Sequence, residues 1–351
     1  MALGALGLPL VWVAARRLRG ALPKEWGLQV RLVRLLALLI LITLVGGQVA
    51  TLNEVLQTFA LPFANILAVG LPAIALIGFV LGDQSGLSHL RAWAHLAIGA
   101  WGSTFVALLV ELGLVAFGAA GVALVLTILA PEQLLRIQEL VEIVVRSGEI
   151  EPILDLLTLP WLLLLAFFGF GIVVPMVEEI AKSAGVIFLW RRLTPATAFA
   201  GGLLGGVGFG ITESLGNLVG VTDFWLVAAV TRMATLVMHG FTSGLLGWGI
   251  GQAAAKRKPL HALFTFLGAV VIHGAWNGAV VLLVISGIQL DRNPDGILSI
   301  LLGVGIFVLL SLLMGLLGGC MSGLMWLSRR ARPEVEKENL FASDAIESMT
   351  E

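Results

Sequence analysis

The sequence predicts an all-α fold, a polytopic transmembrane bundle of eight to nine helices. Of its 351 residues, 58% are apolar and only 12% are charged. The apolar residues form continuous spans rather than alternating with polar ones, and about 20 such residues are enough for a helix to cross a bilayer. No polar stretch is long enough to build a soluble domain, so one membrane bundle accounts for nearly all of the chain.

Eight segments have the length and composition of membrane-crossing helices. They are residues 33–52, 59–81, 92–115, 159–190, 195–218, 224–251, 260–287 and 297–327. A shorter apolar piece, residues 1–15, is followed by Arg16, Arg17 and Arg19. Because a signal peptide carries its positive charge before the apolar run, we interpret this piece as a short ninth helix.

The distribution of basic residues predicts the orientation of the bundle. Cytoplasmic loops are enriched in Lys and Arg, and alternate loops of the eight spans lie on the same side of the membrane. The basic residues that gather on one such side are Arg16, Arg17, Arg19, Lys24, Arg31, Arg34, Arg91, Arg191, Arg192, Lys256, Arg257, Lys258, Arg329, Arg330 and Arg332. We therefore expect a multi-pass protein of the cell membrane with a cytoplasmic C-terminus.

The polar segments and the number of cysteines further limit the classes of protein and of metal site that the sequence can represent. Residues 131–157 have helical periodicity with an acidic side, which predicts an external amphipathic helix on the membrane interface; a solvated connector is the alternative. The stretch after Arg332 is polar and charged, as disordered tails are. Cys320 is the only cysteine, which excludes a disulfide framework and a cysteine-rich metal site. The net charge of −1 gives no indication of a nucleic-acid partner, and none is expected.

Ionisable side chains inside the predicted spans are few, and most of them lie in the second half of the chain. An ionised group at the centre of a bilayer costs roughly 2.5 to 3.5 kcal/mol, so each one needs a reason. The polar residues in the second half are Glu178, Glu179, Lys182, Glu213, Asn217, Arg232, His239, His273 and Asn277. Three pairs are four residues apart and share a helix face: Glu178 with Lys182, Glu213 with Asn217, and His273 with Asn277.

Four successive helices carry these groups to one level in the membrane. At about 1.5 Å per residue, Glu178, Glu213, His239 and His273 lie roughly 18 to 27 Å from the cytoplasmic ends of their helices. The positions of the apolar residues do not by themselves require these four polar residues to lie at the same depth. We therefore expect one polar cavity that is shared by the four helices and opens toward water.

Carboxylates and imidazoles in such a cavity can make a nucleophile from water in two ways. A carboxylate can take a proton from water and pass it to a leaving amine. Alternatively, imidazoles with a carboxylate can bind zinc through three protein ligands and leave one position open for water. Asn277 can donate a hydrogen bond to a developing oxyanion. Lys182 can orient or partly neutralise Glu178, and Arg232 can do the same for Glu213.

Four ordered motifs between residues 160 and 290 resemble the PrsW-like intramembrane proteases, which are distantly similar to the CAAX-prenyl protease and bacteriocin-processing group. The motifs are EExxK at Glu178, Glu179 and Lys182, FxxxE at Phe209 and Glu213, a histidine in the next helix at His239, and HxxxN at His273 and Asn277. Any one motif alone is a weak signal. Four of them in order on successive spans are specific.

The resemblance implies an intramembrane endopeptidase that hydrolyses a peptide bond in a membrane-protein substrate, such as a single-pass anti-sigma factor. Members of the family are often described as metalloproteases. Carried over to this sequence, Glu178 and Glu179 would activate water, and Glu213, His239 and His273 would be further catalytic groups or ligands of zinc or another divalent metal. The CAAX-type group has a histidine where Glu213 stands, so a metal-free glutamate mechanism based on that group transfers poorly.

This interpretation divides the chain into four segments. They are N-terminal transmembrane helices over 1–130, the external amphipathic segment over 131–158, a catalytic transmembrane core over 159–328 and a cytoplasmic disordered tail over 329–351. The glycines of the core, such as Gly201, Gly205, Gly208 and Gly210, lack the preceding strand that a phosphate-binding loop requires. We expect them at close contacts between helices.

Functions of other classes are also compatible with intramembrane charges. A proton-coupled secondary transporter would use them as a proton relay, but it predicts an internal repeat, and the first half holds no second set of charges. A non-catalytic membrane scaffold would bind partner helices without depending on Glu178. The acidic pair can also be a purely structural ion-pair network with Lys182 and Arg232.

Overall fold

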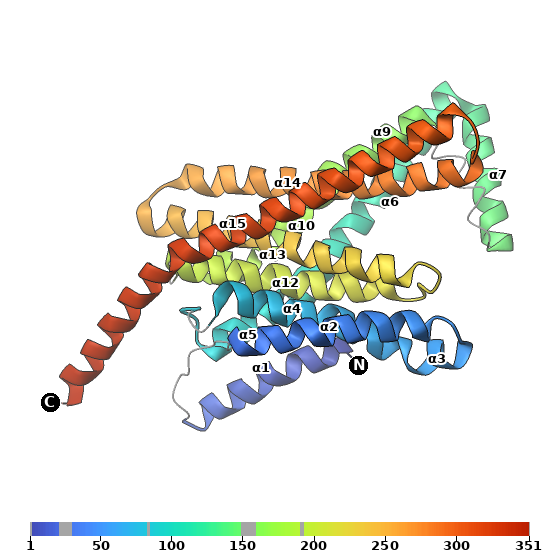
Figure 1. The fold of residues 1–351 in the computed structure, drawn as a ribbon. Helices are drawn as coiled ribbons and strands as arrows, with labels where there is room; N and C mark the ends of the chain where they lie inside the picture. Colours follow the sequence, from blue (N-terminus) through green and yellow to red (C-terminus); the bar gives the residue numbers. More distant parts are fainter. Residues whose placement is uncertain (1, 21–29, 83–84, 149–158, 190–192, 351) are drawn as a thin grey trace. The chain divides into compact units, whose positions relative to one another are not determined.

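The computed structural model describes residues 2–20, 30–82, 85–148, 159–189 and 193–350, and in these ranges the chain forms helices and turns but no β-strand (Figure 1). The predicted all-α class is therefore confirmed. The helices are α1 (Ala2–Leu18), α2 (Val30–Ala50), α3 (Glu54–Phe59), α4 (Leu61–Leu81), α5 (His89–Ala97), the π-helical turn η1 (Ile98–Ser103), α6 (Thr104–Leu129), α7 (Pro131–Ser147), α9 (Pro160–Phe168), the π-helical turn η2 (Gly169–Val173), α10 (Val174–Lys182), α11 (Ala184–Leu189), α12 (Pro195–Leu218), α13 (Trp225–Lys256), α14 (Pro259–Arg292) and α15 (Ile297–Thr350).

Six helical stretches within the described residues are long and apolar enough to cross a membrane. They are Leu61–Leu81, His89–Leu129, Pro160–Lys182, Pro195–Leu218, Pro259–Arg292 and Ile297–Arg332. The remaining two predicted spans fall on α2, of which Arg34–Ala50 is a shorter apolar helix, and on α13, whose apolar run contains Arg232 and His239. The piece predicted as a ninth helix is α1. The chain is thus a polytopic bundle, although the count of eight to nine spans is not established.

The chain forms two compact units, and each unit is assembled from segments that are distant in the sequence. Unit 1 consists of Met1–Phe105, Glu178–His273 and Gly315–Glu351, and unit 2 consists of Val106–Val177 and Gly274–Met314. The boundaries fall inside helices α6, α10, α14 and α15, because a long helix can pack against different neighbours along its two halves. They differ from the four segments expected from the sequence, which follow changes in polarity alone.

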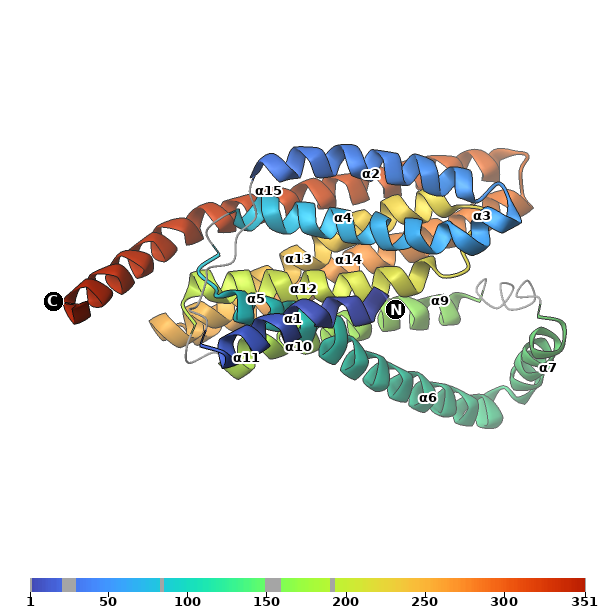
Figure 2. The same cartoon turned by 90° about the horizontal axis from the view of Figure 1, so that it is seen from below.

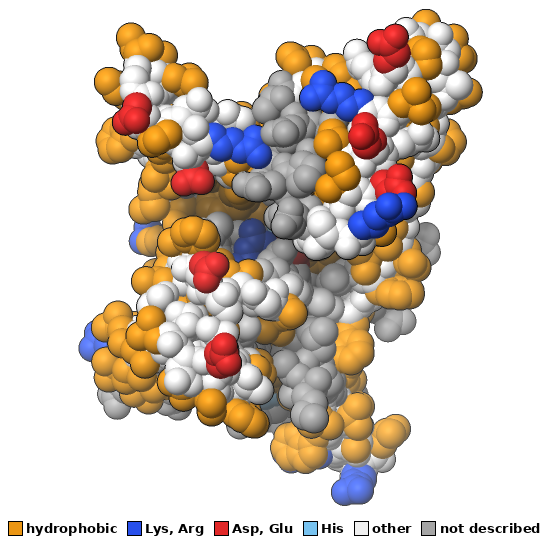
Figure 3. Space-filling view, turned by 90° about the vertical axis from the view of Figure 1, so that its right-hand side faces the viewer, with side chains coloured by type: hydrophobic (Ala, Val, Ile, Leu, Met, Phe, Trp, Pro, Cys, Tyr) orange, Lys and Arg blue, Asp and Glu red, His pale blue; other side chains and the backbone are white. Residues whose placement is uncertain are grey.

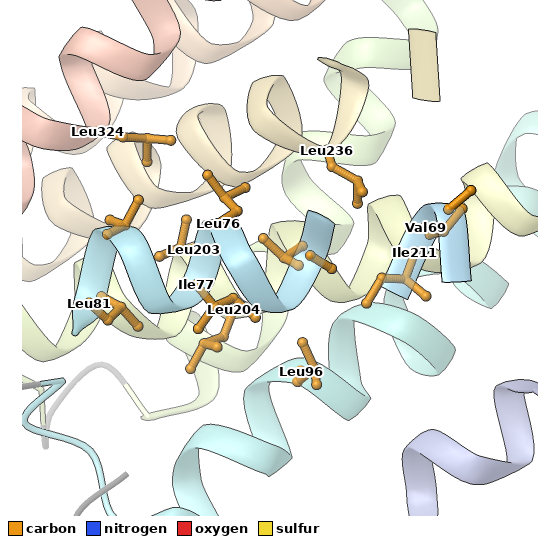
Figure 4. Packing of buried hydrophobic residues seen from close by; sticks show 14 of the residues in the cluster. Val69, Leu76, Ile77, Leu81, Leu96, Leu203, Leu204, Ile211, Leu236 and Leu324 are labelled. Carbon is orange, nitrogen blue, oxygen red and sulfur yellow. The ribbon is translucent and has the colours of Figure 1, made fainter. Parts of the chain in front are cut away.

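Helix α12 lies at the centre of unit 1, where it packs along α4, α5 and α13. Figure 4 shows side chains of these neighbours facing α12, among them Leu76 and Ile77 of α4 beside Leu203 and Leu204. Of the most apolar stretch of α12, 94% is buried inside the protein. This stretch of α12 is therefore surrounded by other helices, whereas Glu213, near the C-terminal end of the helix, is part-exposed.

Helices α12 and α13 run side by side, with their backbones in close contact (Figures 1 and 2). A Cβ atom added at Gly202 would collide with the carbonyl oxygen of Ser243, and one added at Gly206 would collide with that of His239. Without a hydrophobic driving force in lipid, helices associate through such close packing of small residues. The glycines singled out from the sequence are also confirmed as close-packing positions: Gly201, Gly205, Gly208 and Gly210.

Helix α7 in unit 2 is the helical part of the amphipathic segment expected over 131–157. It begins at Pro131 and ends before Gly148, which has the left-handed conformation that terminates many helices. None of its residues is buried, and its apolar side chains include the exposed Leu135 and Val145. Figure 3 shows hydrophobic and acidic side chains together on the face where α7 lies. Residues 149–158 lie outside the described part, and the membrane-interface location stays a prediction.

The C-terminal segment differs from the sequence expectation. Helix α15 continues to Thr350, whereas the composition after Arg332 predicts a disordered tail. Nothing after Pro333 interrupts helical hydrogen bonding, because that stretch contains no further proline and no glycine. Lys24, Arg191 and Arg192, which contribute to the predicted orientation, lie outside the described residues.

Candidate active site

Helix α10 carries the acidic pair and Lys182 at its C-terminal end. A turn at Ser183 follows, and the carbonyl oxygen of Ala181 accepts a hydrogen bond of 2.7 Å from the Ser103 hydroxyl of η1. Carbonyl groups at a helix end need such partners because no later turn of the helix supplies an N–H group. The span predicted over 159–190 therefore breaks directly after Lys182, and the broken end is fixed to η1.

Glu213 of α12 connects two side chains of α13. Its Oε1 accepts a hydrogen bond of 3.0 Å from Arg232, and its Oε2 lies 2.7 Å from Nε2 of His239. Thr212, the residue before Glu213, donates a hydrogen bond of 2.6 Å to the carbonyl oxygen of Ala100 in η1. This contact fixes the rotation of α12 about its axis. The predicted pairing of Arg232 with Glu213 is confirmed.

Glu178, His239 and His273 come together from α10, α13 and α14 within unit 1. Each offers one potential metal-ligand atom, and these atoms lie within 4.8 Å of one another. The side chains of both histidines are 1% exposed, and that of Glu178 is 9% exposed. Ligand atoms about 2.0 to 2.2 Å from a tetrahedral zinc ion lie about 3.3 to 3.5 Å apart, so a contraction of at most about 1.5 Å would form such a site.

Each imidazole in this group uses one ring nitrogen to contact a carboxylate outside the candidate metal group. Glu213 contacts Nε2 of His239 at 2.7 Å, and Glu179 Oε1 contacts Nδ1 of His273 at 2.9 Å. A ring nitrogen that donates a proton to a carboxylate leaves the other nitrogen as an acceptor, and metal-binding histidines are commonly oriented in this way. Nδ1 of His239 and Nε2 of His273 are then the acceptors, and the latter lies 3.5 Å from Glu178 Oε2.

Glu179 is fully buried, and all its contacts are with other site groups. Its oxygens lie 3.1 Å from Lys182 Nζ, 2.9 Å from His273 Nδ1, 3.0 Å from Thr242 Oγ1 and 3.4 Å from Ser243 Oγ. A buried carboxylate with several donors is satisfied and held in one orientation. Glu179 is therefore placed to orient the neighbouring side chains. It is too enclosed to exchange protons directly with a substrate.

Lys182 occupies the middle of the cluster, and its side chain is 0% exposed. Its Nζ lies 2.8 Å from Glu178 Oε2, 3.1 Å from Glu179 Oε1, 2.7 Å from His239 Nδ1 and 4.4 Å from the centre of the Phe209 ring. The predicted contact between Lys182 and Glu178 is confirmed. Its Nζ also lies 3.5 Å from His273 Nδ1, so one ammonium group contacts two carboxylates and two imidazoles.

The donor set differs in one member from the metal ligands predicted from sequence. The prediction names Glu213, His239 and His273, but Glu178 is the carboxylate that lies with both imidazoles. Glu213 stands on the opposite edge of the His239 ring, bonded to Nε2. Depth along the helices places both glutamates at one level, but only the rotation of each helix decides which edge of the ring a carboxylate reaches.

The two asparagines of the predicted polar group have different positions. Asn217 donates a hydrogen bond of 3.3 Å to Glu213. Asn277 lies in unit 2, where its amide donates a hydrogen bond of 3.2 Å to the carbonyl oxygen of Phe170. Its role as an oxyanion donor stays a prediction.

Thr242 and Ser243 bind Glu179 but are not singled out in the sequence analysis. They follow His239 by three and four residues and therefore lie one helical turn along the same face of α13. This spacing is the signal that would have indicated them. Hydroxyl residues are common in membrane helices, so the signal is weak without the partner carboxylate.

The donor chemistry of the cluster fits a divalent metal. Catalytic zinc sites commonly use three protein ligands from histidine and carboxylate and keep one position open. Both imidazoles here are backed by carboxylates, as such ligands commonly are. With neutral imidazoles, the three carboxylates outnumber the cations Lys182 and Arg232 by one, so the cluster carries net negative charge.

Comparison with known proteins gives one match. The model of the PrsW family intramembrane metalloproteases matches residues 89–315, which is more than half of the chain and includes the whole cluster. No curated protein and no solved structure matches the chain.

Proposed function

The chain belongs to the PrsW family of intramembrane metalloproteases, and from this premise we propose that it cleaves a membrane protein at the cluster of Glu178, His239 and His273. The observation that carries the proposal is the convergence of these three buried side chains from three different helices. Ionisable groups inside membrane helices are rare and mark functional sites. Hydrolysis is the chemistry for which carboxylate, imidazole and a divalent cation are suited.

A divalent metal, zinc being the ion that this donor set suits, would be held by Glu178, His239 and His273. Bound there, it would supply a Lewis acid that polarises the peptide carbonyl and activates water. Glu213 and Glu179 keep the two rings turned toward it through hydrogen bonds of 2.7 and 2.9 Å.

Glu178 is the carboxylate that exchanges protons with the substrate. Its side chain is 9% exposed, whereas Glu179 is 0% exposed and bonded to Thr242 and His273. One oxygen of Glu178 would face the metal, and its other oxygen accepts a proton as the water oxygen bonds to the peptide carbonyl carbon. It then returns that proton to the amide nitrogen as the carbon–nitrogen bond breaks, which leaves a carboxylic acid and an amine.

The substrate that we propose is a single-pass membrane protein such as an anti-sigma factor. Glu178 and His273 lie on helices that are long and apolar enough to cross a bilayer, so a scissile bond within or beside a membrane helix can reach the site without passing through a soluble domain. We further propose that the protein resides in the cell membrane with its C-terminus in the cytoplasm, because the clustered Arg and Lys residues favour that side. A C-terminal reporter that is active only in the periplasm or outside the cell would contradict this orientation.

The test of the function is cleavage of a membrane-embedded reporter by purified full-length protein in lipid. Glu178→Gln removes both the proton acceptor and the charged member of the candidate metal ligands with little change in shape, and we expect a loss of about 10²-fold or more in rate. Glu142→Gln on α7 is the matched control, because Glu142 is exposed and bonded only to Arg146 among the described contacts. Undiminished cleavage by Glu178→Gln, with its insertion and expression intact, would rule out the proposal.

A further inference from the structure

Lys182 competes for the same donors that a divalent metal would use. Its Nζ lies 2.8 Å from Glu178 Oε2 and 2.7 Å from His239 Nδ1. These are hydrogen-bonding distances to two of the three side chains that form the candidate metal site. An ammonium group and a metal ion cannot both occupy the space between those atoms.

We infer that Lys182 is an internal counter-cation that a metal ion must displace from Glu178 and His239 when it binds. The inference rests on the proposed function only in taking Glu178, His239 and His273 as the donors. It adds that the affinity for metal depends on the exchange of the Lys182 ammonium for the metal ion. It also adds that Lys182 stabilises the folded protein when no metal is bound.

The surroundings of Lys182 provide a position to which its ammonium can withdraw. Glu179 Oε1 lies 3.1 Å from Nζ, and the face of the Phe209 ring lies 4.4 Å from it. Neither contact involves a candidate metal ligand. The lysine side chain has a flexible four-carbon stem, so its ammonium can shift toward Glu179 and Phe209. The charge then stays paired, and the ligand atoms of Glu178 and His239 become available to a metal ion.

Repulsion between two cations at the same carboxylate also favours exchange over simple addition. With neutral imidazoles, the buried carboxylates Glu178 and Glu179 have Lys182 as the cation in contact with both. Removing that cation from a membrane interior leaves unpaired charge, which is strongly destabilising. A divalent ion at Glu178 compensates this loss. The lysine and the metal therefore stabilise the same donors in alternative states.

The test is cobalt(II) titration of metal-stripped, full-length protein, followed by the visible absorption of the bound ion. The apparent dissociation constant in wild type is the intrinsic constant divided by the fraction of molecules in which Lys182 has moved away from the metal-binding atoms. We expect Lys182→Met to bind cobalt at least about tenfold more tightly than wild type, and Lys182→Arg, which retains the cation, to bind no more tightly.

Arg232→Met is the control for a general effect of charge. Arg232 is a second cation in the site, but it contacts Glu213 at 3.0 Å and none of the three donors in the described contacts. We expect its loss to change cobalt affinity by less than about threefold. An equal gain in Arg232→Met and Lys182→Met would overturn the inference, because charge alone would then explain both.

Thermal unfolding gives a second readout that does not depend on activity. Metal-free Lys182→Met should unfold at a lower temperature than metal-free wild type, and cobalt should raise its midpoint by more. If Lys182→Met does not fold, Lys182→Gln keeps a hydrogen-bond donor without the charge and should behave alike. Cobalt affinity in these variants equal to or weaker than wild type, or no binding by any of them, would overturn the inference. Reporter cleavage that depends on Glu178 would uphold the proposed function in either case.

Discussion

Substituting Gly206 with alanine should disable the site through packing alone. A Cβ at this position would collide with the backbone carbonyl oxygen of His239, and helix α13 would have to move by roughly 1 Å to restore ordinary contact. Backbone cannot rotate away as a side chain can, and 94% of the most apolar stretch of α12 is buried. We therefore expect overpacking to cost about 1 to 3 kcal/mol of stability.

The same displacement would move His239 away from Glu213 on α12, which holds its ring in place, and would shift it relative to the other two candidate ligands. A misplacement of about 1 Å in a catalytic group lowers rates by about 10²-fold. We expect the kcat/KM of Gly206→Ala for a membrane-embedded reporter to fall by about that factor, and its unfolding midpoint in detergent to fall as well. Both quantities can be measured on the same purified preparation.

Gly216→Ala is the matched control for this experiment. Gly216 lies on the same helix, but a Cβ there would have no heavy-atom neighbour within 4 Å. Alanine is a better helix former than glycine, so this variant should keep or slightly gain stability and keep its rate. Wild-type rate and midpoint in Gly206→Ala would refute the close approach of α12 and α13 at His239.

Two other predictions concern the metal. Glu213→Gln removes the carboxylate behind His239 without removing one of the three candidate ligands, so metal affinity should fall by about 10- to 100-fold but remain measurable by cobalt titration; complete loss of binding would instead identify Glu213 as a ligand. Stripping the protein with a chelator should abolish reporter cleavage, and adding zinc back should restore it; full activity after verified stripping, with elemental analysis showing no bound metal, would contradict a metal-dependent mechanism.

Much of the helical architecture could be predicted from the sequence because lipid restricts what a chain can do. Every backbone polar group must be satisfied within a membrane, so long apolar spans form helices. The spans at α4, α12, α14 and α15 follow from this rule. The rule does not decide whether α13 crosses the membrane. This helix carries Arg232 and His239, and its position depends on packing against α12.

The membership of the site could be predicted, but the roles of its members could not. Spacing of four residues and equal depth bring Glu178, Glu213, His239 and His273 to one level. Which carboxylate joins the two imidazoles depends on helix rotation, and contacts such as that of Thr212 with Ala100 determine it. A hydrogen bond between residues on different helices leaves no periodic pattern in the sequence.

The same glycines of α12 determine both the packing of the helices and the geometry of the site. Helices in lipid gain little from burying apolar surface, so their association depends on close contact between small residues. The glycines that allow this contact, Gly202 and Gly206, also bring the α13 backbone against α12 and place His239 within 2.7 Å of Glu213. Where close packing excludes water, charges interact more strongly. The residues that hold the bundle together therefore also set the electrostatics of the cluster, and a change to either should be detected in both stability and metal binding.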